Sequence, residues 1–224
     1  MTVNMKQLAA EKAVDEFVKD GMTVGLGTGS TAYYAIKRVG ELVSKGYKLT
    51  CVATSVQTEE VAKECGIRVV DIDEVDRIDV TIDGADEVDP KMQLIKGLGG
   101  ALLREKIVAS ASATEVIIID DSKLVEKLGT KCPLPVEVLK FGHNKTKKAL
   151  ERQGCIAVLR MKGEEPFITD SGNYIYDCRF DGIHNPFFLE SRINVIPGVV
   201  DNGLFLNMAN AVVISSSDGT VRMM

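Results

Sequence analysis

The sequence predicts an α/β fold: a parallel sheet with helices on both faces, joined to a smaller α+β unit. Short apolar runs alternate with amphipathic stretches over roughly the first 130 residues. Buried strands that alternate with helices are typical of parallel sheets. After Pro133 the pattern becomes β-α-β-β-α, up to about residue 200. The stretch Val199–Ile214 again has short apolar runs and is expected to return to the first unit.

The first part of the chain carries recognisable helix signals. Asn4 with Gln7 has the pattern of a capping box, and the helix that follows is expected to stop at Asp20-Gly21. A buried strand is expected over Met22–Leu26, then a glycine turn and a helix over Thr31–Lys45. The other elements expected here are strands over 49–53, 78–82 and 116–119, a helix capped by Ser55 and ending at Cys65-Gly66, and a helix over 100–110.

The second unit has its own signals. Pro133–Leu139 is expected to be an edge strand, because proline has no N–H for an interior ladder. A basic helix over Lys145–Gln153, stopped by glycine, precedes a strand over Cys155–Met161. A turn at 169–173 leads into a strand over Tyr174–Cys178. Pro186 opens a helix that ends before residue 196.

Composition excludes several classes of protein. The chain has 224 residues, 45% of them hydrophobic, which suits one large domain or one domain plus a small one. A net charge of −5 argues against a nucleic-acid surface. No apolar run approaches about 18 residues and residues 1–20 lack a signal-peptide pattern, so we expect no membrane span and a cytoplasmic protein. Five scattered cysteines without a C-x-x-C pair indicate reduced thiols rather than disulfides or zinc.

The loop G-L-G-T-G-S-T at 25–31 follows a predicted strand and opens a helix. Glycines let backbone N–H groups approach an anion, and a helix N-terminus favours negative charge. Gly29, Ser30 and Thr31 therefore predict a phosphate or sugar-phosphate site.

Two other interpretations of this loop stay open. Gly27-x-Gly29-x-x-Ala32 fits a loose dinucleotide fingerprint, but the next strand ends in Thr54 and Ser55 rather than the acid that the ribose requires. The loop also lacks the lysine of a P-loop. A purely structural tight turn, capped by Ser30 or Thr31, is the remaining interpretation.

Asp83-Gly-Ala-Asp86 follows the predicted strand 78–82, so it lies at the carboxyl edge where open parallel sheets bind ligands. Two carboxylates three residues apart can favour different protonation states. The alternatives are an Asp-Gly turn that binds its own backbone, and a metal site that also uses Glu87 and Asp89. His143 and His184 lie far away in sequence, which argues against the metal.

Lys96-Gly-Leu-Gly-Gly100 places a cation beside backbone N–H groups that could stabilise an oxyanion. Glu105 lies near the first turn of the following helix, where acids are common for electrostatic reasons alone. Lys123, in Asp120-Asp-Ser-Lys, could reach a phosphate, or the segment could simply be a helix cap formed by Asp121 or Ser122.

In this order the segments resemble the ribose-5-phosphate isomerases of the A type. The resemblance covers nearly the whole chain, and Leu98 is one departure, since some members have glycine there. It is carried by G-x-G-T-G-S-T-A at 25–32, Thr54-Ser55, V-T-I-D-G-A-D-E at 80–87, K-G-x-G-x-A-L-x-R-E-K-I at 96–107, D-x-S-K at 120–123, P-L-P-V-E-V at 133–138 and N-V-I-P-G-V-V at 194–200.

The resemblance implies reversible conversion of D-ribose 5-phosphate to D-ribulose 5-phosphate through an enediolate, in the non-oxidative pentose phosphate pathway. It implies a Rossmann-like catalytic domain over 1–130 plus 200–224, and an inserted ferredoxin-like domain over 131–199. It also implies a homodimer that binds a small sugar phosphate, without metal or organic cofactor and without nucleic-acid or membrane partners.

The same resemblance assigns roles to residues. Glu105 becomes the base that moves the proton between C1 and C2, while Asp83, Asp86 and Lys96 assist ring opening and stabilise the enediolate. The residues expected to bind substrate are Thr28, Gly29, Ser30, Thr31, Asp83, Gly84, Ala85, Asp86, Lys96, Gly97, Leu98, Gly99 and Lys123. A nucleotide-binding oxidoreductase and a non-catalytic sugar-phosphate sensor remain as alternatives at this point.

Overall fold

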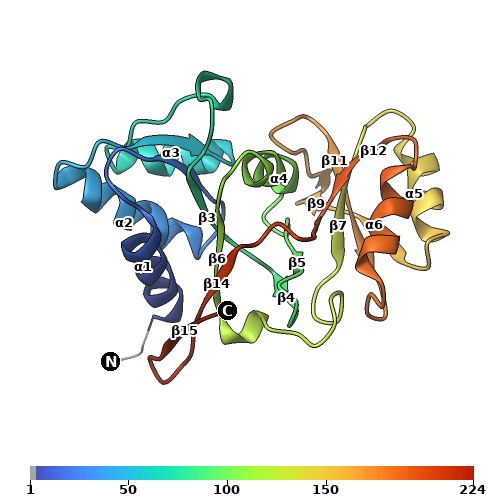
Figure 1. Ribbon diagram of the computed structural model, residues 1–224. Helices are drawn as coiled ribbons and strands as arrows, with labels where there is room; N and C mark the ends of the chain where they lie inside the picture. Colours follow the sequence, from blue (N-terminus) through green and yellow to red (C-terminus); the bar gives the residue numbers. More distant parts are fainter. Residues whose placement is uncertain (1–3) are drawn as a thin grey trace. The chain divides into compact units, whose positions relative to one another are not determined.

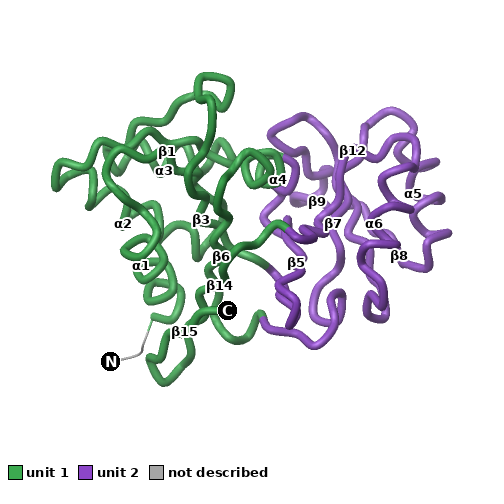
Figure 2. Tube along the Cα trace, in the orientation of Figure 1, with its two compact units in different colours: residues 1–85, 104–123, 208–224 green, residues 86–103, 124–207 purple. Residues whose placement is uncertain are grey.

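Figure 1 shows the computed structural model, which describes residues 4–224. The chain forms two compact units, coloured separately in Figure 2. Unit 1 contains the described residues up to Ala85, together with 104–123 and 208–224. Unit 2 contains 86–103 and 124–207. The predicted first domain begins in residues 1–3, which lie outside the described residues.

Unit 1 is built on a six-stranded sheet in the order β15-β14-β6-β3-β1-β2, of which β15 alone is antiparallel to its neighbour. The strands are β1 Thr23–Leu26, β2 Thr50–Ala53, β3 Val80–Gly84, β6 Glu115–Asp120, β14 Ala211–Ser215 and β15 Val221–Met223. The helices are α1 Met5–Phe17, α2 Ala32–Ser44, α3 Val56–Glu64 and α4 Leu102–Ser110, with short 3-10 turns at Ile72–Glu74 and Asp121–Lys123. Every helix and strand expected in this unit is present.

The predicted helix caps are confirmed where a side chain accepts from the first turn. Asn4 accepts the N–H of Gln7, and Ser55 accepts that of Thr58. Only this half of the box at Asn4 is formed, and the side-chain amide of Gln7 donates to Glu11. The helix also ends at Phe17, three residues before the expected stop at Asp20.

Helices lie on both faces of this sheet, as predicted. One core cluster joins α1, α2 and α3 to the strands, whereas Val108 of α4 packs in a second cluster with Val52 and Ile78.

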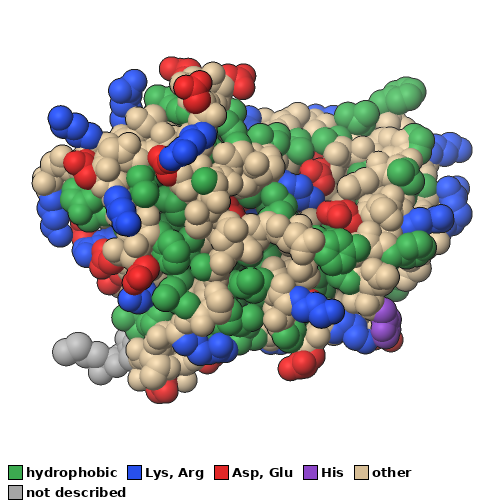
Figure 3. All heavy atoms as spheres, viewed as in Figure 1, with side chains coloured by type: hydrophobic (Ala, Val, Ile, Leu, Met, Phe, Trp, Pro, Cys, Tyr) green, Lys and Arg blue, Asp and Glu red, His purple; other side chains and the backbone are tan. Residues whose placement is uncertain are grey.

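Cys51 lies in the first cluster, where burial raises the pKa of its thiol to about 12 and keeps it protonated. Acidic side chains gather on the surface over the loop that carries the 3-10 turn at 72–74 (Figure 3).

Unit 2 contains a four-stranded antiparallel sheet in the order β12-β7-β11-β8. Its elements are β7 Leu134–Val138, α5 His143–Glu151, β8 Ile156–Leu159, β11 Tyr174–Arg179, α6 Pro186–Asn194 and β12 Val199–Asn202, with a small hairpin of β9 Met161–Lys162 and β10 Glu165–Pro166. Thr146 and Leu150 are the buried residues of α5. Lys and Arg side chains gather over its outer side in Figure 3, as the basic pattern predicted.

The prediction that Pro133–Leu139 forms an edge strand is wrong, because β7 lies between β11 and β12. Pro135 is tolerated there because it sits where the β12 ladder ends. Its carbonyl accepts the Gly203 N–H at 2.8 Å, and the donor that proline lacks would have faced the Gly203 carbonyl. That carbonyl accepts the N–H of Lys96 instead, at 2.9 Å.

A third, three-stranded sheet in unit 2 was not predicted. It has the order β13-β5-β4, with β4 Glu87–Val88, β5 Leu94–Ile95 and β13 Leu204–Phe205. Two residues are too few to show the alternation by which a strand is recognised. These antiparallel sheets and the main parallel sheet confirm a mixed α/β fold.

The compact units differ in extent from the predicted domains. The stretch 86–103 belongs to unit 2, because β4 and β5 pair with β13 rather than with the parallel sheet. The predicted boundary at 199/200 lies inside β12, which pairs with β7. Of the stretch 199–214, only β14 joins the sheet of unit 1.

Glu87 tests how unit 2 is held together. Its buried carboxylate accepts the backbone N–H groups of Gly129, Lys131 and Cys132 at 2.5, 2.5 and 2.8 Å. Glu87→Ala should lower the free energy of unfolding by about 3 kcal/mol or more, since each unsatisfied buried donor costs about 1–3 kcal/mol. Urea unfolding measures the change, and exposed Glu126→Ala is the control. Equal stability of the two variants would contradict this role.

Candidate active site

The candidate site in unit 1 lies where the strand order reverses. From β1 the chain crosses to β2 on one side and later returns to β3 on the other, so β1 and β3 border the switch point of the sheet. Ligands of open α/β sheets bind outside the carboxyl ends of the strands at such a point. The loop 27–31 follows β1, and Asp83 lies at the end of β3. The fold thus brings the predicted phosphate loop and the first predicted carboxylate together.

Gly27 and Asp83 fit so closely that no other residue can replace the glycine without movement. A Cβ on Gly27 would overlap the carboxylate of Asp83 and approach its Cα within 2.6 Å. One carboxylate oxygen of Asp83 accepts the N–H groups of Thr28 at 3.0 Å and Gly84 at 2.7 Å. The Asp83 side chain is buried, so this carboxylate fixes the loop from inside.

The hydroxyl of Thr28 lies in a cluster of hydroxyl groups. Its Oγ1 lies 2.7 Å from Thr54 Oγ1, 2.8 Å from Ser55 Oγ and 3.1 Å from Thr58 Oγ1. Thr54 also donates to the carbonyl of Leu26, the last residue of β1, and Thr58 donates to that of Gly27. The place where a dinucleotide fold needs an acid is therefore filled by hydroxyls that bind the chain itself.

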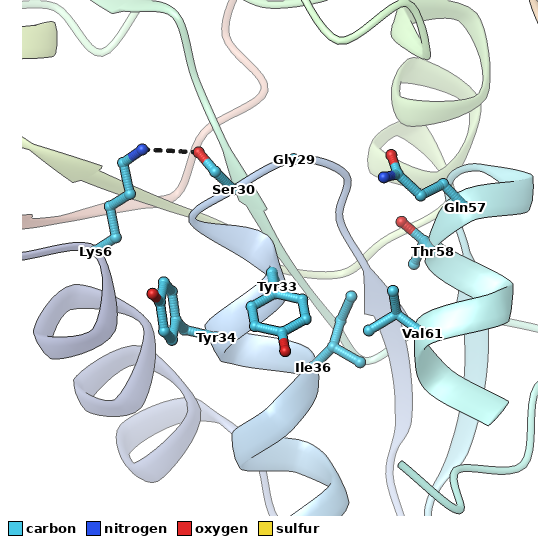
Figure 4. A pocket seen from close by; sticks show the side chains of 9 residues that line it. All are labelled: Lys6, Gly29, Ser30, Tyr33, Tyr34, Ile36, Gln57, Thr58 and Val61. Atoms are coloured by element: carbon cyan, nitrogen blue, oxygen red, sulfur yellow. Dashed lines mark hydrogen bonds between the residues drawn. The ribbon is translucent and has the colours of Figure 1, made fainter. Parts of the chain in front are cut away.

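An open pocket of about 510 Å³ surrounds the outer side of this loop. In Figure 4, Lys6 from α1 and Ser30 from the loop point toward each other, and the lysine Nζ donates to Ser30 Oγ at 2.9 Å. The lining residues are Lys6, Gly29, Ser30, Tyr33, Tyr34, Ile36, Gln57, Thr58 and Val61. This arrangement adds a cation to a loop whose own sequence has none.

Lys6 is not among the site residues predicted from the sequence, since it lies outside the loop and more than 20 residues before Ser30. A signal was available, because Lys6 lies in the first turn of α1, where a cation opposes the helix dipole. The interpretation of the loop as a turn capped by Thr31 is not supported. Thr31 precedes α2 but makes no side-chain capping hydrogen bond, and Ser30 accepts from Lys6 instead.

Glu105 lies in the first turn of α4 and is buried. The end of this helix lies at the amino edge of the sheet, because the N–H of Ala113 bonds to Ile78, just before β3, at 2.8 Å. Its first turn therefore lies toward the carboxyl edge. Close packing is possible because Gly25 of β1 has no Cβ, which would come within 2.9 Å of Val108. Glu105 precedes Val108 by three residues and shares its face of the helix.

Lys123 ends the 3-10 turn that follows β6, at the same edge of the sheet. The carboxylate of Asp120 accepts the N–H and the hydroxyl of Ser122 and so caps this turn. The alternative that Asp121 or Ser122 caps this turn is therefore wrong. The capping residue is Asp120, the last residue of β6. Lys123 is half-buried.

Unit 2 carries Asp86 and the Lys96–Gly100 segment. Asp86 is fixed by its N–H, which bonds to the Ile95 carbonyl, and by Oδ2, which accepts the Leu98 N–H at 2.9 Å. The N–H of Gly100 bonds to the carbonyl of Gly97 at 3.0 Å. Two of the N–H groups expected to face an oxyanion are thus used within the chain, because the segment folds into a tight turn.

Lys96 follows β5 and is buried, with its Nζ 5.3 Å from the ring centre of Phe205. Its backbone is held by the bond to Gly203 described above. A Cβ on Gly203 would overlap the Lys96 carbonyl oxygen, so the glycine permits this approach. The backbone of the lysine is therefore held by Gly203, the residue before β13.

The metal interpretation loses its proposed ligands. Glu87 accepts three backbone N–H groups, and Asp89 accepts those of Lys91 and Gln93. Within residues 4–224 no group of three or more His, Cys, Asp or Glu side chains is arranged to hold a metal. The same residues include no helix that combines the length and the apolar character needed to cross a membrane.

Comparison with known proteins identifies the family of this chain. The family model of ribose 5-phosphate isomerase A, also called phosphoriboisomerase A, matches residues 50–219. The chain belongs to the ribose 5-phosphate isomerase A family. Relatives named ribose-5-phosphate isomerase A occur in Bacillus mycoides, 50% identical over 97% of this chain and 98% of the relative, and in Gloeobacter violaceus, 52% identical over 96% and 94%.

Solved structures of family members agree over the full length. The ribose 5-phosphate isomerase of Plasmodium falciparum is 44% identical, with a TM-score of 0.95 over 98% of this chain and 97% of that one. A D-ribose-5-phosphate isomerase in complex with phospho-erythronic acid is 40% identical, with a TM-score of 0.96 over 100% and 99%. The expected family and its isomerase activity in the pentose phosphate pathway are confirmed, and the oxidoreductase and sensor alternatives are set aside.

Gly27→Ala should disturb the site without removing any of its functional groups. The new Cβ overlaps Asp83, so that carboxylate or the phosphate loop must move, and misplacement of about 1 Å can cost about 10²-fold in rate. We expect kcat for ribose 5-phosphate to fall by more than about 10-fold. Glu126→Ala, at an exposed position outside the site, is the control and should keep the kcat of the wild type. Wild-type kcat in Gly27→Ala would refute the constraint.

Proposed function

We propose that this chain interconverts D-ribose 5-phosphate and D-ribulose 5-phosphate through an enediolate, with Glu105 as the base. The observation that carries this proposal is the buried carboxylate of Glu105 in the first turn of α4, toward the same sheet edge as the phosphate loop. Family membership supports the reaction. The roles of individual residues come from the resemblance to this family, and the position and chemistry of each residue support them.

In the proposed reaction Glu105 removes the proton from C2 of the open-chain aldose. The electron pair forms the C1–C2 double bond, and the C1 carbonyl oxygen takes up the negative charge. Return of the proton to C1, with transfer of the hydroxyl proton from O2 to O1, gives the ketose. A general base contributes about 10²–10⁴-fold to such a step. Atoms and charge balance without an external oxidant or cofactor.

Asp83, Asp86 and Lys96 are proposed to open the sugar ring and stabilise the enediolate. Burial favours this role for Lys96, because a cation acts more strongly on a developing charge where water is excluded. Its position over the Phe205 ring is compatible with a retained charge. Backbone groups of Gly84, Ala85, Gly97, Leu98 and Gly99 are proposed to line the sugar.

The phosphate is proposed to bind at Gly29, Ser30 and Thr31, at the N-terminus of α2, with Lys123 and Lys6 as cations. The helix dipole and the contact of Lys6 with Ser30 support this. Thr28 is proposed to contribute mainly by ordering the loop, since its hydroxyl lies in the Thr54–Ser55–Thr58 cluster. The solved relative in complex with phospho-erythronic acid supports a sugar-phosphate ligand.

The finer description of the fold belongs to the same proposal. The switch point between β1 and β3 supports a Rossmann-like unit 1. The βαββαβ order of unit 2, with strands in the sequence 4-1-3-2, supports a ferredoxin-like fold. A homodimeric, cytoplasmic enzyme without cofactor remains the expectation from the family.

The role of Glu105 is tested by Glu105→Gln, which keeps the shape of the side chain and removes the base. We expect kcat to fall by about 10²-fold or more while KM for ribose 5-phosphate changes little. The measurement is steady-state isomerisation in both directions. The control, Glu64→Gln at the exposed end of α3, should match the wild type. Near-normal kcat in Glu105→Gln would remove it from the mechanism.

The phosphate site is tested by Lys6→Met, which keeps the stem and removes the charge. Because the phosphate does not change during the reaction, KM should rise by about 10-fold or more while kcat stays within a few fold. Lys12→Met is the matched control on the same helix, since Lys12 pairs with Glu16 on the exposed face. A fall in kcat with unchanged KM would place Lys6 near the reacting carbons instead.

A further inference from the structure

Arg160 contacts the Lys96–Gly100 segment from the sheet of unit 2. It lies between β8 and β9, and its side chain is 12% exposed. Its Nη1 donates to the carbonyl oxygens of Gly97 at 2.9 Å and Leu98 at 3.1 Å. One guanidinium nitrogen therefore binds two successive backbone carbonyls. An arginine that only forms an ion pair at the surface makes no such contacts.

The guanidinium is itself fixed on its other side. Nε and Nη2 donate to the two carboxylate oxygens of Asp177 at 2.9 and 2.5 Å, which is the bidentate arrangement that arginine favours. Phe167 lies 5.9 Å from the guanidinium carbon, and a Cβ on Gly100 would overlap the Phe167 ring. The backbone N–H of Arg160 bonds to Ile175 in β11. The arginine thus connects a rigid sheet to the turn.

The direction of the carbonyls determines the direction of the N–H groups. In a trans peptide the C=O and the following N–H point to opposite sides of the chain. With the Gly97 and Leu98 carbonyls turned toward Arg160, the N–H groups of Leu98 and Gly99 face the other side. The Leu98 N–H does so, because it donates to Asp86 Oδ2. Two successive N–H groups on one side form an anion-binding concavity.

We propose that Arg160, held by Asp177, is a positioning residue that turns the Leu98 N–H group toward Asp86 and the Gly99 N–H group toward the reacting sugar oxygens. This proposal rests on the proposed function and adds to it a residue that does not touch the substrate. Arginine suits the task because its planar fork serves a carboxylate and a neighbouring carbonyl pair at once. Lysine, as a single point of charge, does not.

The decisive variant is Arg160→Lys, which keeps the charge beside Asp177 and loses the contact with both carbonyls. We expect kcat for ribose 5-phosphate to fall by about 10-fold or more with KM nearly unchanged, because the phosphate is held elsewhere. Arg179→Met, an exposed arginine on β11 of the same sheet, is the control and should keep wild-type kinetics.

A binding measurement separates positioning from a general structural role. 4-Phosphoerythronate has a carboxylate where the enediolate oxygens would lie, whereas ribitol 5-phosphate has neither carboxylate nor carbonyl. Arg160→Lys should weaken the first by a factor similar to its loss of kcat and the second by less than about twofold. A merely structural defect would weaken both ligands alike and lower the melting temperature.

A second variant, Arg160→Met/Asp177→Leu, tests whether a folding defect explains the result. It removes both charges together, so that neither charged side chain is left mostly buried without its partner. It should show the same selective loss. Kinetics like those of Arg179→Met, or equal weakening of the two ligands, in either variant would overturn the proposal. Failure of the proposed function would be seen separately, as absence of turnover in the wild type or full activity in Glu105→Gln.

Discussion

The close approach of Gly27 to Asp83 is the constraint on which the candidate site of unit 1 depends. Because Gly27 has no side chain, β1 and β3 end so near each other that one buried carboxylate accepts the N–H of Thr28, in the loop after β1, and that of Gly84, at the end of β3. The loop that follows β1 is thereby fixed before α2 begins, and this fixes the position of the N-terminus of α2. Lys6, from another helix, then supplies the cation that the loop lacks.

A related constraint acts in unit 2 on backbone carbonyls. Pro135 has no N–H to offer Gly203, so the Gly203 carbonyl is left to bind Lys96. Arg160 binds the next two carbonyls, those of Gly97 and Leu98. The segment that carries the proposed catalytic lysine is therefore held along its backbone by groups that make no contact with a sugar. Such support from rigid elements is what pre-organised sites require.

The local signals in the sequence predicted well those elements that depend on local chemistry. Asn4 and Ser55 cap helices because their side chains accept N–H groups three residues away. The edge-strand prediction for Pro133–Leu139 failed because whether a proline is tolerated depends on what lies opposite it. Here that is the end of the β12 ladder.

The sequence by itself determined the family, the parallel sheet and the candidate catalytic residues. The reason is that hydrophobic periodicity, helix capping and glycine spacing depend on residues that are close together in the chain. Tertiary structure decided which groups face which. It selected Lys6 as the partner of Ser30, committed the Leu98 N–H to Asp86, and set Arg160 against the Gly97 carbonyl. These contacts join residues up to 63 positions apart. Such pairings follow from the packing of whole elements, which no local pattern encodes.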